Sequence, residues 1–269
     1  MSAENGFFTD VTLCIGCKAC EVACKQWNEL PADGYAFSGN SYDNTGRLSA
    51  STWRHVAFVE QMDRVDPAAS RWMMLSDVCK HCTYAGCLEA CPTGAIVRNE
   101  FGDVYVQPDV CNGCGYCVPS CPFGVVAVQP DKGVAQKCTL CYDRQKDGLE
   151  PACAKACPTD SITFGPVEEL RAKAEARVAK LRADGREAHL YGVDGAETRD
   201  VGPLNAFFLL PDRPEVFNLP PKPVLPSTFQ PAAYASGLLG ALALAAVGLA
   251  VFRTPADGTS ARRGSRPQA

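Results

Sequence analysis

The sequence predicts an α+β protein built from two related modules, followed by a single membrane-spanning helix. Three observations predict this class. All sixteen cysteines of the 269-residue chain lie between Cys14 and Cys157, in four groups of four. Short apolar runs bounded by turn residues lie between these groups and are typical of β-hairpins. A run without any charged residue, 232–252, lies near the C-terminus.

The four cysteine groups repeat one spacing. In each, two residues separate the first two cysteines and three residues separate the last two. The sets are Cys14, Cys17, Cys20 and Cys24 (set one), Cys79, Cys82, Cys87 and Cys91 (set two), Cys111, Cys114, Cys117 and Cys121 (set three), and Cys138, Cys141, Cys153 and Cys157 (set four). Proline follows sets two, three and four, whereas Lys25 follows set one. The pattern is that of the bacterial ferredoxin run, in which three thiolates hold one iron–sulfur cubane and the fourth reaches another.

Sixteen thiolates, at four for each cubane, predict four [4Fe–4S] clusters with no cysteine left over. A disulfide scaffold fits less well because such chains are usually short and secreted, and the opening MSAENGFFTD predicts no signal peptide. Structural zinc sites use two close Cys/His pairs with a long spacer, which is a different pattern. The net charge of −4, without a basic stripe, indicates no nucleic-acid partner.

Two hairpins are expected between the sets. Apolar runs at Ala95–Val97 and Val104–Val106 flank a turn at Asn99–Gly102, and a similar stretch further on turns at Pro130–Gly133. Small residues inside the cysteine loops let backbone amides approach the cluster sulfurs; they are Gly16, Ala19, Gly113 and Gly115. Four lysines near the sets either raise cluster potentials or lie solvated at the surface; they are Lys18, Lys25, Lys80 and Lys137.

The segment after the last set predicts a charged amphipathic helix. Pro166 stands near its start, Glu168 and Glu169 in its first turn and Gly185 past its end. Apolar residues recur every three or four positions, at Val167, Leu170, Ala174, Val178 and Leu181. We expect this helix to pack on its own module; a partner-binding face is the alternative.

Residues 211–231 contain seven prolines and predict an extended, semi-rigid strap without a packed element. The uncharged run 232–252 then has the length needed to cross a bilayer, about 30 Å of hydrocarbon, and a buried soluble helix is the alternative. Small residues four apart in it suit docking against another membrane helix. The tail carries four arginines, Arg253, Arg262, Arg263 and Arg266, against Asp257 alone.

The positive-inside rule therefore predicts a cytoplasmic C-terminus and a cluster domain on the periplasmic side of the cell membrane. Since no export signal is expected, the protein would leave the cytoplasm folded, carried by a signal on a partner.

The chain resembles the four-cluster iron–sulfur subunits of molybdopterin oxidoreductases, and within them the β subunits of membrane-bound respiratory formate dehydrogenases. The resemblance covers nearly the whole chain and rests on CIGCKACEVACKQWNEL, CKHCTYAGCLEACPTGAI, CNGCGYCVPSCPFGV, KCTLCYDRQKDGLEPACAKACPTDSITFG, AEARVAKLRADG, VFNLPPKP and the single span. Trp27–Asn28, after set one, points to the formate dehydrogenase branch, and packing over the cluster loop is the simpler account of Trp27. The departures, Lys25 for a proline and PTDSI where PTGAI is commoner, touch no ligand.

The resemblance implies that sets one and four share clusters, as do sets two and three. The implied ligands are Cys14, Cys17, Cys20 and Cys157 (cluster 1), Cys79, Cys82, Cys87 and Cys121 (cluster 2), Cys91, Cys111, Cys114 and Cys117 (cluster 3), and Cys24, Cys138, Cys141 and Cys153 (cluster 4). The module of sets two and three is then inserted in the other. The expected parts are residues 1–65 with 136–165 (first ferredoxin-like module), 66–135 (second module), 166–210 (charged helix and packing segment), 211–231 (strap), 232–252 (transmembrane helix) and 253–269 (basic tail).

The resemblance also implies a function. Electrons would pass singly through four clusters, from a molybdenum- or tungsten-pterin catalytic (alpha) subunit to a membrane cytochrome b (gamma) subunit and quinone. No nucleophile–base pair, phosphate loop or pterin-binding domain is recognisable, so we expect no catalytic site in this chain. The alternatives are an electron-transfer subunit of a sulfur-compound or nitrate reductase, one of a hydrogenase, and a membrane-tethered zinc protein.

Overall fold

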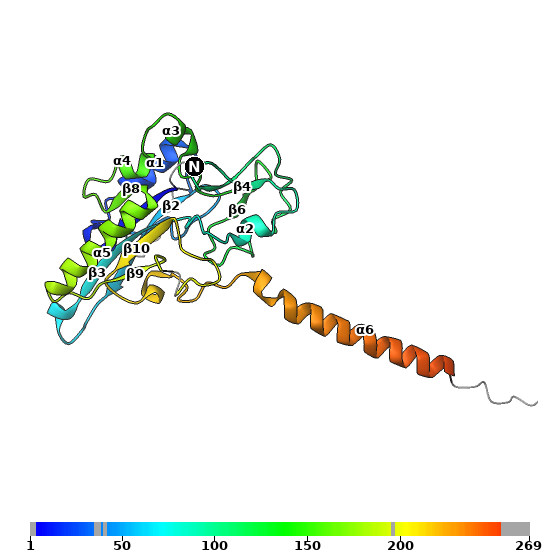
Figure 1. Ribbon diagram of the computed structural model, residues 1–269. Helices are drawn as coiled ribbons and strands as arrows, with labels where there is room; N and C mark the ends of the chain where they lie inside the picture. The colour runs from blue at the N-terminus through cyan, green and yellow to red at the C-terminus, as the bar shows by residue number, and fades with distance from the viewer. Residues whose placement is uncertain (1–3, 35–38, 40–41, 195–196, 254–269) are drawn as a thin grey trace, which may run out of the picture. The chain divides into compact units, whose positions relative to one another are not determined.

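The computed structural model describes residues 4–34, 39, 42–194 and 197–253, and the chain divides into two units, Met1–Ser227 and Thr228–Ala269. Figure 1 labels many of the elements. The strands are β1 Asn5–Asp10, β2 Arg54–Gln61, β3 Arg71–Val78, β4 Ile96–Arg98, β5 Val104–Val106, β6 Ala127–Gln129, β7 Val134–Gln136, β8 Ile162–Pro166, β9 His189–Tyr191 and β10 Ala206–Leu210. The α-helices are α1 Ala19–Trp27, α2 Gly86–Glu89, α3 Tyr142–Lys146, α4 Ala152–Lys155, α5 Val167–Ala183 and α6 Gln230–Arg253.

A four-stranded sheet in the order β8-β1-β10-β9 is the scaffold of the first unit. The N-terminal strand β1 is inside the sheet, antiparallel to β8 and parallel to β10. All five residues of β10, AFFLL, are buried, as expected for a strand covered on both faces. Helix α5 packs along this sheet (Figure 1) and contributes to the same aliphatic and aromatic core.

Helix α5 confirms the prediction made from the period of its apolar residues. The five predicted positions, Val167, Leu170, Ala174, Val178 and Leu181, are the buried residues of the helix. Pro166 lies just before its first residue, and Glu168 and Glu169 lie in its first turn. The apolar stripe therefore covers the scaffold sheet, as in the expectation that the helix packs on its own module.

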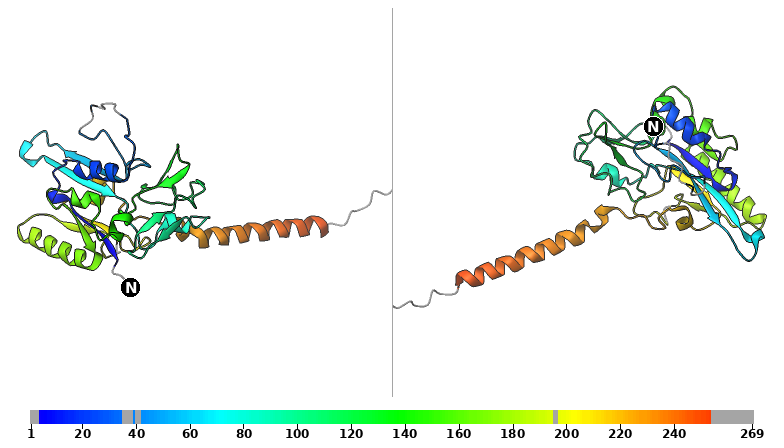
Figure 2. Two further views of the ribbon diagram at one scale, coloured as in Figure 1. Left: turned by 90° about the horizontal axis from the view of Figure 1, so that it is seen from above. Right: turned by 180° about the vertical axis from the view of Figure 1, so that it is seen from behind.

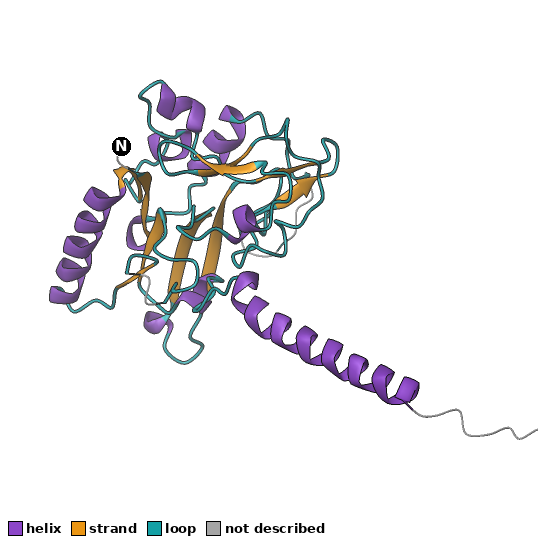
Figure 3. Ribbon diagram, turned by 45° about the vertical axis from the view of Figure 1, so that its right-hand side comes forward, coloured by secondary structure: helices purple, strands orange, loops and turns teal. Residues whose placement is uncertain are grey.

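A second core is organised around the cysteines and lies beside short hairpins. Both predicted hairpins are confirmed, β4 with β5 and β6 with β7. They lie on the side of the domain away from α5 (Figure 2), in a region that is mostly loop (Figure 3). Few regular elements are needed here because the cysteines themselves gather in the core.

The long hairpin of β2 and β3 was not predicted. Its eight-residue strands pair in antiparallel register from Arg54 with Val78 to Gln61 with Arg71. RHVAFVEQ and RWMMLSDV do not alternate strictly between apolar and polar residues, so a period-2 search misses them. The expected boundary at residues 65/66 lies in the loop between these paired strands.

The proline-rich segment 211–231 corrects one expectation. Its proline content predicts no packed element, yet 3₁₀ turns form at Pro214–Phe217 and Pro226–Phe229. Phe217, Leu219 and Leu225 are buried in the scaffold core, and the Tyr191 hydroxyl donates to the Pro220 carbonyl at 2.5 Å. Prolines restrict the path of the chain, but they do not prevent the apolar residues between them from packing.

The second unit consists of α6, which contains the predicted span 232–252. Among the described residues it is the one helix long and apolar enough to cross a membrane, and none of its side chains is buried in the protein. Exposed leucines along its length are typical of a surface covered by lipid or by another helix. Of the basic tail, residues 254–269 lie outside the described part of the chain.

Candidate functional site

One cavity is lined by the cysteines expected at cluster 1. Cys14 and Cys17 lie in the loop before α1, Cys20 lies in that helix, and Cys157 follows α4. All four line the same cavity, together with side chains from β2 and β3. The structure thus brings Cys157 to three cysteines that precede it by more than 130 residues.

A second cavity is lined by the cysteines expected at cluster 2. Cys79 and Cys82 come from the segment between β3 and α2, Cys87 lies in α2, and Cys121 comes from set three. The loop carrying them is held by the segment before β10, since the amides of Thr83 and Tyr84 donate to the carbonyls of residues 203 and 201. The scaffold sheet therefore positions the set-two loop.

The four cysteines expected at one cluster form a group, numbered as that cluster. The third and fourth groups are recognised by the thiols that raise one another's pKa. Burial raises the pKa of Cys117 to about 11, and Cys111, Cys114 and Cys91 raise it as neighbouring charges. This is the group expected at cluster 3.

Burial also raises the pKa of Cys24, and the nearby Cys153 and Cys141 raise it further. The pKa of Cys138 is raised by burial and then by Cys24, with Cys153 and Cys141 among its other neighbours. The four cysteines expected at cluster 4 are thus mutual neighbours, although Cys24 comes from set one and the others from set four.

Single cysteine neighbours also connect one group with the next. The charge of Cys20, in the first group, raises the pKa of Cys24 in the fourth. The charge of Cys153, in the fourth group, raises the pKa of Cys20. Cys79 of the second group raises the pKa of Cys138 in the fourth.

Burial raises the pKa of Cys87 in the second group and the charge of Lys137 lowers it. Cys79 and Cys121 of the same group raise it further, as does Cys117 of the third group. The groups therefore follow one another in the order 1, 4, 2, 3.

Exposure differs along this order. Cys17 and Cys114, in the first and third groups, are exposed, and each has an exposed apolar residue nearby in its loop, Ile15 and Tyr116. All four cysteines of the fourth group are buried, and the second group has buried or half-buried cysteines. The end groups are thus accessible from solvent and the inner groups are enclosed.

Left-handed backbone conformations shape the cysteine loops. Gly16, Gly113 and Gly115 have φ of +68°, +71° and +76° in sets one and three. In sets two and four, His81 and Leu140 have φ of +46° and +52° although they are not glycines, which costs about 1–2 kcal/mol per residue. The turn in set four directs an amide toward sulfur, since Leu140 N donates to Cys138 Sγ at 3.3 Å. Strand β7 supplies a second such amide, since Ala135 N donates to Cys111 Sγ at 3.4 Å.

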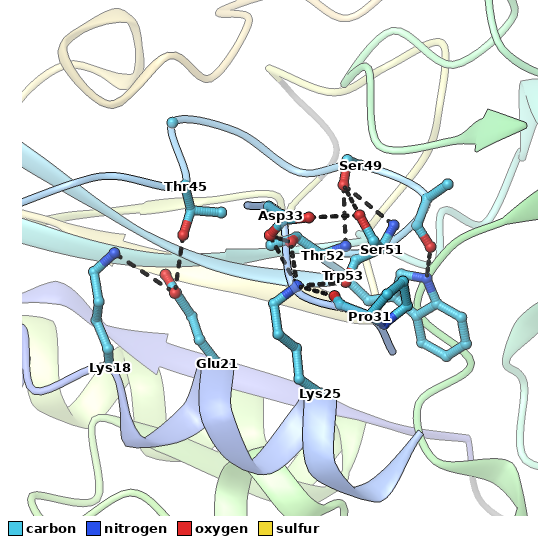
Figure 4. A network of polar contacts seen from close by, with 12 residues as sticks. Lys18, Glu21, Lys25, Pro31, Asp33, Thr45, Ser49, Ser51, Thr52 and Trp53 are labelled. Atoms are coloured by element: carbon cyan, nitrogen blue, oxygen red, sulfur yellow. Dashed lines mark hydrogen bonds and ion pairs between the residues drawn. The ribbon is translucent and has the colours of Figure 1, made fainter. Parts of the chain in front are cut away.

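Three of the four lysines considered from the sequence are paired with carboxylates. Lys25 Nζ is 2.8 Å from Asp33 and also donates to Ser51 and Thr52 (Figure 4). Lys80, 1% exposed, is 2.5 Å from the Asp77 carboxylate.

Lys18 lies 3.5 Å from both the Glu21 and the Asp43 carboxylates. Lys137 differs, because no ion pair among the described residues includes it and it donates to the carbonyls of Val104 and Cys138. Of the four, Lys137 keeps a buried charge without a carboxylate partner.

Trp27 connects set one with set four, and Asn28 contacts Cys24 within set one. Trp27 Nε1 donates to the Asp143 carboxylate at 2.8 Å, and the Arg144 guanidinium lies 4.3 Å from the indole centroid. The Asn28 side-chain amide donates to the Cys24 carbonyl at 2.9 Å and lies 3.7 Å from Cys24 Sγ. Trp27 therefore joins helix α1 to helix α3, and Asn28 caps the helix that carries Cys24.

Two residues near the cysteines were not identified from the sequence. Arg54 is 1% exposed, and Ser76 Oγ lies between Arg54 Nη1, at 3.1 Å, and Cys20 Sγ, at 3.2 Å. The only signal available was a charged residue at the start of a strand, which is an ordinary surface position in most sheets.

The donor set fits iron–sulfur cubanes. Thiolates supply the iron ligands, and N–H groups directed at sulfur tune such clusters. Among the described residues, no group of three or more Cys, His, Asp or Glu side chains could hold a single metal ion. A cubane binds each thiolate to a different iron, so its ligands surround a volume larger than one ion.

Comparisons with known proteins agree with this donor set. Two family models described as a 4Fe–4S dicluster domain match residues 13–95 and 70–167. The chain is 44% identical to the formate dehydrogenase iron–sulfur subunit of Haemophilus influenzae, over 79% of this chain and 67% of the relative. It is 43% identical to the formate dehydrogenase-O iron–sulfur subunit of Escherichia coli, over 77% and 71% respectively.

A more distant relative belongs to the anaerobic dimethyl sulfoxide reductase of E. coli; the identity is 33% over 78% of this chain and 98% of the relative. Two dicluster domains account for the sixteen cysteines, at four clusters of four thiolates each. The chain belongs to the family of formate dehydrogenase iron–sulfur subunits, and it is an electron-transfer protein that carries four [4Fe–4S] clusters.

Proposed function

We propose that this chain carries electrons singly, within a formate dehydrogenase complex, from a molybdenum- or tungsten-pterin catalytic subunit to a membrane cytochrome b and quinone. When bound, each [4Fe–4S] cluster supplies the capacity to take up and release one electron. The observation that carries the proposal is the continuous order of the four cysteine groups, 1, 4, 2, 3, each with a cysteine neighbouring the next group.

The ligand sets follow from the same neighbours. We propose that each cluster is held by the four cysteines of its group, three from one set and one from a distant set. Cys24 would then serve the group of Cys138, Cys141 and Cys153, and Cys157 would serve the group of Cys14, Cys17 and Cys20. The crossed ligands also tie sets one and four into one module, and sets two and three into another.

The chain's own residues would enclose the inner groups and leave the ends accessible. Burial of Cys24, Cys138, Cys141 and Cys153 keeps water from the middle of the path. The exposed loops around Cys17 and Cys114, with Ile15 and Tyr116, would face partner subunits, because electrons have to enter and leave where clusters approach the surface.

The membrane would be reached through α6. An uncharged run of 21 residues, 232–252, spans about 30 Å as a helix, and its small residues would let a partner helix approach closely. The arginines of the tail favour a cytoplasmic C-terminus and a periplasmic cluster domain. Alkaline phosphatase fused after residue 269 should be inactive under this orientation, whereas a cytoplasmic reporter there should be active; the reverse pattern contradicts it.

The function is tested on the intact complex. The full-length chain is purified from membranes with the subunits that accompany it, and formate-dependent quinone reduction is measured. We expect a pterin-containing subunit, a cytochrome b and activity on formate. Dimethyl sulfoxide and nitrate reduction are assayed in parallel, because the 33% identity to a dimethyl sulfoxide reductase chain makes a sulfur-compound reductase the second candidate. A complex that acts on one of these and not on formate overturns the proposal.

A further inference from the structure

Arg54, the first residue of β2, is a buried cation without a carboxylate partner. It is 1% exposed, and no ion pair among the described residues includes it. Its guanidinium lies 4.7 Å from the centroid of the Phe7 ring, so one face of the charge meets an aromatic surface. An uncompensated buried charge costs several kcal/mol, so negative charge is expected next to it when the protein is complete.

The neighbours of Arg54 show where that negative charge lies. Its Nη1 donates to Ser76 Oγ at 3.1 Å, and Ser76 Oγ is 3.2 Å from Cys20 Sγ of the first group. Within the part of the chain that the structure describes, its Nε and Nη2 have no hydrogen-bond partner although they are buried. The cysteines that act on its charge are Cys153, Cys20, Cys138 and Cys24, three of them from the fourth group.

Arg54 therefore lies at the junction between the first and fourth groups. Guanidinium carries five donors in a rigid fork and stays charged, so the free Nε–H and Nη2–H need acceptors. Lys18, Lys25 and Lys80 cannot act in the same way because a carboxylate neutralises each of them.

We propose that Arg54 raises the reduction potentials of clusters 1 and 4 together, acting on cluster 1 through Ser76 and Cys20 and on cluster 4 through its free Nε–H and Nη2–H. This inference rests on the ligand sets proposed above. Reduction adds one negative charge to a cluster, and a fixed positive charge in an enclosed site stabilises the reduced form. Arg54 is a tuning residue and binds no iron itself.

The test compares three variants with a matched control. Arg54→Met removes the charge, Arg54→Lys keeps the charge without the fork, and Ser76→Ala removes only the bridge to Cys20. Arg71→Met is the control, since Arg71 is at the opposite end of the same hairpin, paired with Asp212. Seven residues of strand place it roughly 23 Å from Arg54. Each full-length chain is isolated with its accompanying subunits, and iron and acid-labile sulfide are measured before use.

The readout is the set of midpoint potentials from redox titration followed by electron paramagnetic resonance. In Arg54→Met we expect two of the four potentials to fall, each by at least a tenfold change in the oxidised-to-reduced ratio, which is about 59 mV for one electron. Arg54→Lys should lower the same two by less, Ser76→Ala should lower one of them, and Arg71→Met should lower none.

Four unchanged potentials in Arg54→Met, or an equal fall of all four, overturns the inference. If Arg54→Met assembles fewer than four clusters, Arg54→Lys and Ser76→Ala decide, and unchanged potentials in both overturn it. The titration uses chemical reductants, so its outcome is independent of whether formate is the substrate. A complex that fails the formate assay can therefore still confirm or contradict the prediction about Arg54.

Discussion

The cysteine loops of sets one and three differ from those of sets two and four in how they turn and how far they are exposed. Just before their second cysteines, sets one and three turn at a glycine, and each has an exposed cysteine, Cys17 or Cys114, although Lys18 of set one is also left-handed. At the same position sets two and four have His81 and Leu140 in left-handed conformations, and these sets have no exposed cysteine. A glycine at this position allows close backbone approach at the surface, whereas the enclosed loops accept backbone strain there that their packing and ligation offset. The loops of sets one and three thus belong to the groups at the ends of the order, 1 and 3, and the loops of sets two and four belong to the inner groups, 2 and 4.

The largest contrast is expected between an enclosed and an exposed ligand. Cys24→Ala should lose the cluster of Cys138, Cys141 and Cys153, because no water or thiol from solution can replace a buried sulfur. Electron transfer through the chain should fall by more than the roughly 100-fold typical of losing an outer-shell partner. Iron content and electron paramagnetic resonance measure the loss.

Cys17→Ala is the matched variant at the exposed end. A solvent ligand can reach this position, so most of the iron should remain and added thiol should restore the signal in part. Equal cluster loss in the two variants contradicts the argument from exposure, whereas loss of the set-one cluster in Cys24→Ala contradicts the crossed assignment.

Two glycines of the set-three loop separate backbone approach from backbone strain. A Cβ on Gly113 would overlap the Gly133 carbonyl, whereas a Cβ on Gly115 meets only Val128, at 3.9 Å. Gly113→Ala should therefore displace the β6–β7 turn and release iron from this set on mild heating. Gly115→Ala has a similar φ and should cost only the strain, about 1–2 kcal/mol. Loss of the 400 nm absorbance with temperature distinguishes them, and identical curves contradict the packing argument.

The raised pKa of Asp103 predicts that the free energy of unfolding depends on pH. Burial raises the pKa of this carboxyl to about 7, although Asn99 and Gln145 donate to Oδ2. In the unfolded chain its pKa is near 3.9, so between roughly pH 4 and 7 the folded protein binds the extra proton. Its contribution to the free energy of unfolding therefore falls as pH rises through this window, by at most about 1.4 kcal/mol per pH unit.

Asp103→Asn should remove that slope. Relative to the wild type, the variant should gain thermal stability steadily from pH 5 to pH 7 and gain no more above it. Asp63→Asn is the control, because backbone hydrogen bonds from Asp66 and Val65 lower the pKa of this exposed carboxyl and it titrates below the window. A constant difference between Asp103→Asn and the wild type at all pH values would mean that Asp103 does not titrate there.

The smallest effect is expected at Trp27, which connects the two kinds of loop. Trp27→Phe loses the indole hydrogen bond to Asp143 and weakens stacking of Arg144, in a half-exposed site. The two contacts together contribute about 1 kcal/mol. The midpoint of thermal denaturation should fall by roughly 2–4 °C, and cluster content should not change. A marked loss of clusters would instead give Trp27 a direct role in holding set one.

The sequence predicted the parts whose signals are local. Cysteine spacing gave the four sets, apolar runs around turn residues gave both short hairpins, and the helical period gave the buried face of α5. The β2–β3 hairpin escaped because its strands do not alternate, and β1 and β10 because their pairing joins residues about 200 apart. Arg54 escaped for the same reason: its burial depends on β3 and on cysteines of sets one and four, which no local pattern encodes.

The position of β1 has a consequence for the time course of synthesis. This N-terminal strand pairs with β8 and with β10, so its two edges cannot be paired until residues 162–166 and 206–210 have been synthesised. At about 5–20 residues per second, a ribosome needs roughly 10–40 s to make the intervening chain. During that interval FFTD and the first four thiols are unprotected, and a nascent chain has to be kept from aggregating and oxidising. Under the proposed ligand sets, iron–sulfur loading of the first site would follow the translation of Cys157.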